Sequence, residues 1–365
     1  MPLVTYIMKD TVVTDARDTL MDLLLGAAGY TNDLQKYSKG FFNTRTYHID
    51  RPRPIIMRPL AQFVAGTQNV PRDYMHFRIP KASGGTRLIE APNDSLKQVQ
   101  RRIADMMMVD YKLLPHNAAY AYTRGRCAYD SLVTHQRNNA RWFLKLDIKD
   151  FFPSITKEVL KEQLPKIYPL CLIDKNVEFF DNLTHVATNA DNVLPQGSPL
   201  SPLLSNLTMV EFDLKLTKAL RRFNYQTYTY TRYADDMLIS CPYEFKYQDI
   251  IDAIEELFKE LNLPFVIARH KVRYASSAGR NWNLGLMYNY EQKITVGSKR
   301  KKELHSLLNS FVVEYPWDKQ STQELLGKLA YIRNVEPEYT DSMITKYNTK
   351  YSVDVRKMFT DILRD

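Results

Sequence analysis

The sequence of 365 residues has little cysteine, little glycine and no long hydrophobic run. Its three cysteines, Cys127, Cys171 and Cys241, are odd in number and widely spaced, which excludes a framework of paired disulfides and a four-cysteine zinc site. No run of 18 apolar residues occurs, so no transmembrane helix is predicted and we expect a soluble, cytoplasmic protein. The 12 glycines form no flexible linker, and the chain shows no internal repeat.

An excess of positive charge is the first feature that the sequence does have. Fifty Lys and Arg residues against 41 Asp and Glu residues leave a formal net charge of +9 and a pI near 9.2. This balance favours a polyanionic partner such as a nucleic acid but does not identify one. A hydrophobic content of 44% is enough to bury a full core, as one large domain or as two to three subdomains.

Periodic patterns predict both strands and helices. Residues 74–92 alternate polar and apolar side chains around Ser83-Gly84-Gly85, which predicts a hairpin closed by a glycine turn; residues 142–148 and 227–241 are further strand candidates. Helices are predicted around Leu20 to Leu25, on the face of Leu96, Val99, Ile103, Met106 and Met107, on that of Leu200, Leu203, Leu204 and Leu207, and on that of Leu304, Leu307, Leu308, Phe311 and Val312. Segment 51–59, rich in Pro and Arg, is predicted to be an extended strap.

Acidic residues lie at the ends of two predicted strands. Asp147 closes one, and Asp235 and Asp236 lie at the bend between two others. Without a cation such carboxylates would repel and raise each other's pKa, whereas magnesium ions about 3.5 to 4 Å apart are held by such oxygens and clamp a phosphoryl transfer. Asp147 and Asp235 are the predicted ligands and Asp236 supports them. Adjacent strand residues point to opposite faces, so Asp235 and Asp236 cannot contribute equally unless a tight turn re-aims one of them. The alternative is a solvated Asp-Asp turn.

Three motifs in order resemble those of reverse transcriptases. RYADDMLIS at 232–240 is similar to their YxDD box, LKLDIKDFFPSI at 144–155 to their first carboxylate motif, and LPQGSPLSPLLSN at 194–206 to the Gln-Gly motif between them. The opening from Phe77 to Pro92 resembles bacterial enzymes of retrons, group II introns and phage defence, and the resemblance covers about residues 74 to 350. Asn283-Leu284-Gly285 stands where retron enzymes typically carry Val-Thr-Gly, which argues against a strict retron assignment. Group II intron proteins extend past the thumb into a maturase domain, whereas this sequence stops at Asp365, so we do not expect intron mobility.

The resemblance implies an α+β right-hand polymerase with fingers, a ferredoxin-like palm and a helical thumb. It divides the chain into an N-terminal extension at 1–70, mainly fingers at 71–145, palm with fingers insertions at 146–290 and thumb at 291–365. It implies an RNA-directed DNA polymerase that uses two Mg²⁺ ions, for which Mn²⁺ can substitute. The implied metal ligands are Asp147, Asp235, Asp236 and the backbone carbonyl of Ile148.

Nucleotide contacts are implied by the same motifs. The residues concerned are Lys81, Arg87, Phe152, Gln196, Gly197 and Lys271. Lys81 and Arg87 match positions that grip the triphosphate, a role suited to the planar fork of arginine. Gln196 and Gly197 match the contact with sugar and template, where glycine permits close approach, and Lys271 matches the lysine that protonates pyrophosphate. Phe152 matches the ring beneath the deoxyribose that excludes a 2′-hydroxyl; Phe151 is the competing candidate.

Contacts with the primer and duplex are implied further along the chain. Leu284-Gly285 lies where the family has its primer-grip turn, for which a plain β-hairpin is the alternative. Lys299, Arg300, Lys301 and Lys302 crowd a predicted helix start, where the helix dipole disfavours cations. The phosphates of an RNA:DNA hybrid would compensate them. A solvated helix start is the other interpretation.

The implied partners are an RNA template, a DNA product, deoxynucleoside triphosphates and a cognate non-coding RNA in anti-phage defence. No membrane partner is expected, and the sequence indicates no oligomeric state. Two alternatives stay open: a template-independent or RNA-synthesising polymerase on the same palm, and a non-catalytic RNA-binding scaffold. The intact acids favour catalysis, and Phe152 occupies the neighbourhood in which RNA polymerases carry a second acid.

Overall fold

A computed structural model of the protein describes residues 54–80, 84–173, 178–222, 228–277, 282–314 and 317–364. The strands are β1 (Tyr74–Pro80), β2 (Thr86–Pro92), β3 (Trp142–Asp147), β4 (Thr229–Tyr233), β5 (Asp236–Cys241), β6 (Arg273–Ser276), β7 (Met287–Tyr288) and β8 (Ile294–Thr295). The α-helices are α3 (Pro54–Ala65), α4 (Asp94–Asp105), α5 (Ala128–Arg137), α6 (Phe151–Ser154), α7 (Lys157–Gln163), α8 (Phe179–Ala187), α9 (Ser201–Thr208), α10 (Val210–Arg222), α11 (Tyr247–Glu260), α12 (Gly297–Val313), α13 (Lys319–Val335), α14 (Pro337–Tyr351) and α15 (Val355–Arg364). None of these helices combines the length and the apolar character needed to cross a membrane.

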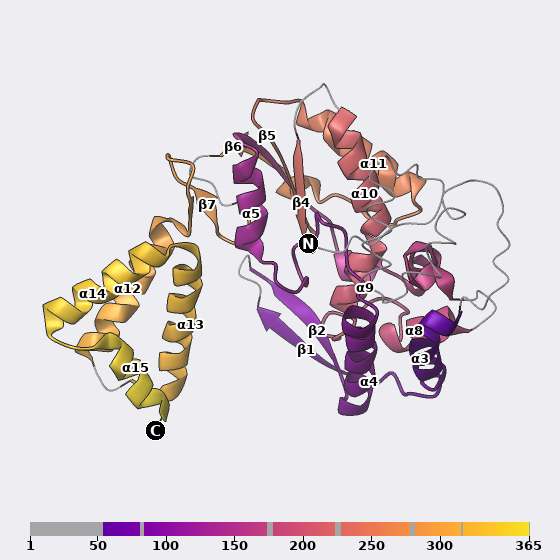
Figure 1. The fold of residues 1–365 in the computed structure, drawn as a ribbon, viewed down its shortest axis with the longest axis horizontal. Coiled ribbons are helices and arrows are strands. Elements are labelled where there is room, and N and C mark those ends of the chain that lie inside the picture. Colours follow the sequence, from indigo (N-terminus) through magenta and orange to yellow (C-terminus); the bar gives the residue numbers. More distant parts are fainter. Residues whose placement is uncertain are drawn as a thin grey trace, which may run out of the picture.

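A four-stranded antiparallel sheet in the order β4-β5-β3-β6 forms the centre of the larger lobe (Figure 1). The predicted strands at 142–148 and 227–241 are therefore confirmed, the second as the hairpin β4–β5. Its register places Asp147 opposite Asp236, and Tyr233 pairs with Asp236 across the turn Ala234-Asp235. The topology thus brings the two acidic segments to one end of the sheet.

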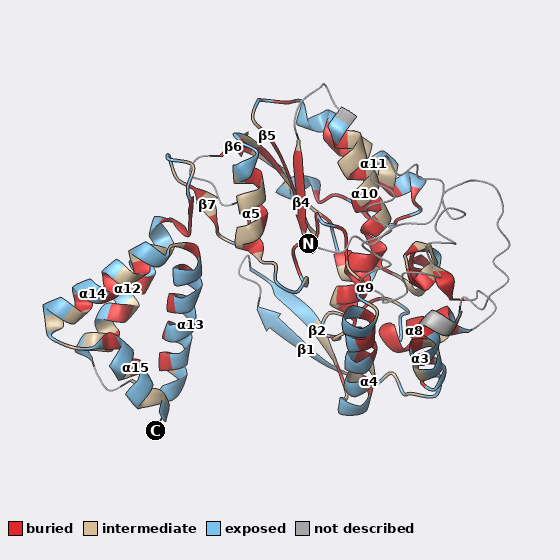
Figure 2. Cartoon of the chain, viewed as in Figure 1, coloured by how far each residue is buried: buried red, intermediate tan, exposed pale blue. Residues whose placement is uncertain are grey.

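The two faces of this sheet are buried in different hydrophobic clusters, because successive strand residues point to opposite sides. Leu144 and Leu146 of β3 belong to the larger cluster, which α10 and α11 cover. Phe143 belongs to the second cluster, with Leu132 of α5. Figure 2 shows buried residues along the central strands and in α9.

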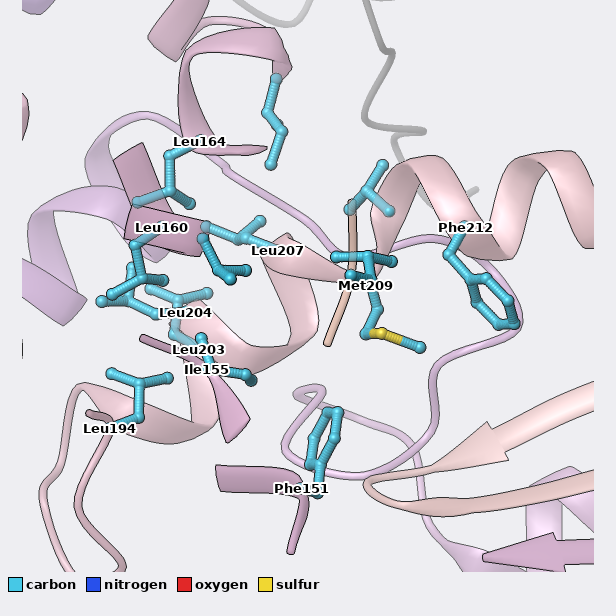
Figure 3. Packing of buried hydrophobic residues seen from close by; sticks show 14 of the residues in the cluster. Phe151, Ile155, Leu160, Leu164, Leu194, Leu203, Leu204, Leu207, Met209 and Phe212 are labelled. Carbon is cyan, nitrogen blue, oxygen red and sulfur yellow. The ribbon is translucent and has the colours of Figure 1, made fainter. Parts of the chain in front are cut away.

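Helix α9 runs through the middle of the larger cluster. Leu200, Leu203, Leu204 and Leu207, the predicted apolar face, are all buried, which confirms that prediction. Figure 3 shows these leucines, except Leu200, facing Leu160 and Leu164, with Phe151 nearby. The segment at 194–200 that precedes the helix is therefore anchored at its C-terminal end in the core.

The hairpin β1–β2 is confirmed, with Tyr74 paired to Pro92 and Pro80 to Thr86. Its described turn residues Gly84 and Gly85 have φ of +89° and +77°, a conformation that favours glycine. Most of its side chains are exposed. One backbone hydrogen bond, from Glu90 N–H to the Gln196 carbonyl at 2.8 Å, ties it to the segment before α9.

The extended strap predicted for 51–59 is wrong for residues 54–59, which belong to α3, and residues 51–53 lie outside the described residues. Proline at a helix start is tolerated since its missing N–H would have no intrahelical partner. Met57, Leu60 and Val64 recur at helical spacing and are buried, so packing stabilises the helix. The helix predicted around Leu20 to Leu25 lies outside the described residues.

Helices α12 to α15 form a second lobe, joined to the larger one near β7 (Figure 1). The stripe predicted for α12 is confirmed: Leu304, Leu308 and Phe311 are buried, while Leu307 and Val312 are partly buried against the same cluster. The Phe311 and Phe359 rings stack at 4.4 Å between centroids, which joins α12 to α15.

Candidate active site

Asp147 and Asp235 lie together at one end of the sheet. Asp147 ends β3, and Asp235 follows Ala234 in the two-residue turn between β4 and β5. The Ile148 N–H donates to the Asp235 carbonyl at 3.0 Å, which fastens the two acidic segments together. Both aspartates and Ile148 line a cavity of about 730 Å³.

Asp236 is held differently. Its carboxylate accepts a hydrogen bond from Lys145 at 2.8 Å, and it is not among the described residues that line the cavity. Lys145 lies two residues before Asp147, hence on the same face of β3. That spacing was available in the sequence, although the pairing with Asp236 was not predicted. The two adjacent aspartates therefore have different surroundings: Asp235 lies in the tight turn and lines the cavity, whereas Asp236 begins β5 and pairs with Lys145.

The charge of Asp235 is unfavourable where it lies. Burial raises its pKa to about 6, and the nearby Asp236 and Asp147 carboxylates add to the increase. Asp147 instead accepts two hydrogen bonds from the Lys271 ammonium, at 2.8 and 3.0 Å. This hydrogen bonding raises the pKa of Lys271. The cavity thus contains acidic groups that a cation would stabilise, and a lysine already neutralises one of them.

This donor set fits a magnesium ion. No group of three His, Cys, Asp or Glu side chains with metal-binding geometry occurs in the described part of the chain. Mg²⁺ does not require one, because it keeps several waters and takes one or two carboxylates together with substrate phosphates. Asp147 and Asp235, which line the cavity together with Ile148, meet that requirement.

Other parts of the cavity wall come from β2 and the segment before α9. Arg87, Gln196 and Gly197 line it. Gly197 has φ of +131°, and a Cβ there would meet the Glu90 carbonyl oxygen at 2.8 Å, so glycine is required by both conformation and space. The buried Gln196 Oε1 has no hydrogen-bond partner among the described residues. Lys81 lies outside the described residues.

The two adjacent phenylalanines are placed differently. The Phe151 ring is 3% exposed and packs against Phe265 at 5.4 Å between centroids. Phe152 is half-buried, and its ring meets Tyr122 edge-on at 6.2 Å. Tyr122, which also lines the cavity, was not singled out in the sequence, where no pattern links it to the acids. Both phenylalanines line the cavity, and Phe152 has the more accessible ring of the two.

The chain matches the family model described as reverse transcriptase (RNA-dependent DNA polymerase) over residues 79–324. It belongs to this family. The retron Ec73 reverse transcriptase of Escherichia coli is 30% identical over 334 residues, covering 86% of this chain and 96% of that protein. The retron Ec83 reverse transcriptase of the same species is 28% identical, covering 78% of this chain and 90% of that protein. A solved structure of apo telomerase from Candida tropicalis gives a TM-score of 0.48 at 13% identity, covering 84% of this chain and 65% of that chain.

Family membership makes the chain an RNA-directed DNA polymerase with the α+β right-hand fold. The relatives also sharpen the comparison with bacterial subgroups. Although Asn283-Leu284-Gly285 differs from the tripeptide typical of retron enzymes, the chain is of the bacterial retron type.

The predicted duplex-binding residues of this reverse transcriptase lie away from the acids. Leu284 and Gly285, with φ of +45° and +88°, close a tight turn between Asn283 and Leu286. Arg300 donates to the Leu284 carbonyl at 3.0 Å and lies 5.4 Å from the centre of the Tyr331 ring. Leu284, Arg300 and Tyr331 line a separate hollow of about 560 Å³, beside α13.

The start of α12 already has an anion from within the chain. The Glu336 carboxylate accepts hydrogen bonds from the Val296 N–H at 3.0 Å and the Thr295 hydroxyl at 2.8 Å, and it pairs with Lys301. This offsets the positive end of the helix dipole without nucleic acid. Of the four predicted cations, Arg300 and Lys301 are engaged within the protein, whereas Lys299 and Lys302 are exposed.

Proposed function

We propose that the 730 Å³ cavity is where this enzyme extends a DNA primer along an RNA template by two-metal phosphoryl transfer. The observation that supports this most is the pair Asp147 and Asp235 at one cavity, with the pKa of Asp235 raised to about 6. Asp147, Asp235 and the Ile148 carbonyl would hold Mg²⁺ or Mn²⁺, and Asp236 would support them from its pair with Lys145. Bound there, the metal would activate the primer hydroxyl and stabilise charge on the transferred phosphoryl group.

The nucleotide would lie between β2 and the acids. Arg87, together with Lys81, would pair with the triphosphate, because guanidinium matches phosphate oxygens. Gln196 and Gly197 would contact the sugar and template, for which the unpartnered Gln196 Oε1 is suited. Phe152 would exclude a 2′-hydroxyl. Lys271 would leave Asp147 and donate a proton to pyrophosphate.

The product duplex would run from this cavity toward the second lobe. We assign fingers to 71–145, palm to 146–290 and thumb to 291–365, with 1–70 as an extension. The Leu284-Gly285 turn would contact the primer, and Lys299 and Lys302 would contact phosphates. Similarity to retron reverse transcriptases supports a cognate non-coding RNA partner and a role in anti-phage defence in the cytoplasm.

The test is incorporation of labelled deoxynucleotides on a primed RNA template with Mg²⁺. Asp147→Asn and Asp235→Asn should each reduce the rate at least about a hundredfold, because each removes a charged metal ligand from the transition state. Asp191→Asn, the same change at an exposed position outside the cavity, is the matched control and should retain full activity. Circular dichroism and melting temperature verify folding.

More than a few per cent of activity in both cavity variants, with metal dependence unchanged, would remove these aspartates from the metal site. Reactions without template, and with ribonucleotides, separate the two alternative polymerase activities from RNA-templated DNA synthesis. Template binding without incorporation in the wild type would indicate a scaffold.

A further inference from the structure

The turn that carries Asp235 has an unusual backbone. Of its two central residues, Ala234 has φ of +58° and Asp235 has no positive φ. Positive φ at the first central residue alone is the pattern of a type II′ hairpin turn, whose first position favours glycine. An alanine there is strained, so surrounding contacts must hold the turn in place.

A buried side chain donates a hydrogen bond to Ala234. Arg232, in β4 two residues before Ala234, is 0% exposed. Its Nη1 donates to the Ala234 carbonyl at 3.1 Å and to Asn206 Oδ1 at 3.0 Å. Its backbone N–H donates to the Ala118 carbonyl at 2.6 Å, so the main chain of Arg232 is also fixed.

The rest of the guanidinium is anchored to helix α10. Nε and Nη2 of Arg232 donate to the two carboxylate oxygens of Asp213, at 3.0 and 2.7 Å. Asp213 is also 0% exposed and accepts a further hydrogen bond from the Tyr230 hydroxyl at 2.7 Å. The planar fork of arginine therefore connects α9, α10 and β4 to the carbonyl of the strained turn residue, a geometry that lysine cannot reproduce.

Stability alone does not account for this arrangement. Desolvating both charges of a buried ion pair opposes their attraction, and well-packed apolar residues are often as stabilising. The network ends on the turn that carries Asp235, so its role is explained if it fixes the orientation of that turn.

We infer that Arg232, anchored by Asp213, is a positioning residue that holds the Ala234-Asp235 turn so that Asp235 faces the cavity. This inference rests on the proposed role of Asp235 as a metal ligand. Loss of the fork should therefore weaken metal binding and slow catalysis more than it alters nucleotide affinity.

The test compares Arg232→Lys, which keeps the charge but loses the fork, with Ile254→Ala. Ile254, on α11, is fully buried in the larger hydrophobic cluster. Its truncation therefore destabilises the protein without changing the hydrogen bonds of Arg232. Each variant is assayed at the same interval below its own melting temperature. Mn²⁺ binding is measured by calorimetry, and kcat and KM are measured for deoxynucleotides.

Arg232→Lys should weaken Mn²⁺ binding and lower kcat by about tenfold each, with KM changed less than about threefold. Ile254→Ala should change neither Mn²⁺ binding nor kcat. Tyr230→Phe removes only one hydrogen bond to Asp213 and should shift Mn²⁺ binding in the same direction by less, which keeps the inference testable if Arg232→Lys does not fold.

The positioning role is overturned if Arg232→Lys and Ile254→Ala have equal Mn²⁺ affinity and equal kcat. If Arg232→Lys does not fold, it is overturned by a Tyr230→Phe variant that loses thermal stability but keeps its Mn²⁺ affinity. Asp235→Asn distinguishes this outcome from failure of the proposed function. If Asp235→Asn is inactive while Arg232→Lys matches the control, only the positioning role fails. If Asp235→Asn is active, the metal-ligand assignment itself is wrong.

Discussion

Three aspartates meet at the end of the sheet beside the cavity, and four cations follow one another at the start of α12, but the two groups of charges are compensated differently. Beside the cavity, Lys271 pairs with Asp147 and Lys145 with Asp236. The half-buried Asp235 lies near both carboxylates, and desolvation raises its pKa to about 6. At the start of α12, Glu336 pairs with Lys301, and Arg300 is bonded to the Leu284 turn. A carboxylate whose charge is not compensated within the chain favours binding of a cation. Charges that are already paired within the chain have less need of an external partner.

The largest expected effect is that of Asp235→Asn on folding stability. Between about pH 3.8 and 6 the folded Asp235 binds its proton more tightly than the unfolded one, so stability falls as pH rises through this window and stays lower above it. Asp235→Asn should therefore raise the free energy of unfolding at pH 7.5 by about 2 kcal/mol, with solvent screening included, and by nothing below pH 3.8. Thermal melts of the wild type and the variant in chelator, at pH 7.5 and below pH 3.8, measure the two differences in stability.

Glu336→Gln provides the opposite expectation in the same melts. It removes the charge that pairs with Lys301 at the start of α12, so it should lower the melting temperature at pH 7.5. If Asp235→Asn is destabilising at pH 7.5, or Glu336→Gln is stabilising, the two regions do not differ as described.

A second prediction sharpens the comparison within the cavity. Phe152→Ala should relax discrimination against ribonucleotides at least about tenfold, equivalent to 1.4 kcal/mol, because its accessible ring would otherwise meet the 2′-hydroxyl. The quantity measured is the ratio of kcat/KM for deoxy- and ribonucleotides. Phe151→Leu is the control: its ring is packed against Phe265, so the variant should lose stability and leave the ratio unchanged. If Phe151→Leu shifts the ratio and Phe152→Ala does not, Phe151 is the residue that excludes the 2′-hydroxyl.

The smallest expected effect concerns the cations of α12. Lys299→Gln with Lys302→Gln should lower the log-log salt slope of binding to an RNA:DNA hybrid by about 1.4 to 1.8, since two exposed phosphate contacts are lost. Arg300→Gln with Lys301→Gln removes the same charge but should mainly lower the melting temperature, because both residues are bonded inside the protein. Identical salt slopes for the two double variants would contradict the distinction between exposed and engaged cations.

Local patterns predicted much of the fold. The strand ending at Asp147, the hairpins at 74–92 and 227–241, and the apolar stripes of α9 and α12 follow from periodicity, which each segment carries in itself. The extended strap was predicted wrongly for residues 54–59, because Pro and Arg were weighed above the buried stripe of Met57, Leu60 and Val64. Packing against the core decided that helix.

The sequence by itself determined which residue types are available to the site: acids at strand ends, a Gln-Gly segment and two adjacent aromatic rings. Only the tertiary structure decided how they are paired. Lys271 with Asp147, Lys145 with Asp236, and Glu336 with the start of α12 join residues that are far apart along the chain. Such contacts depend on strand order and helix packing, which bring distant segments together, so no local pattern specifies which charge is compensated and which is left facing the cavity.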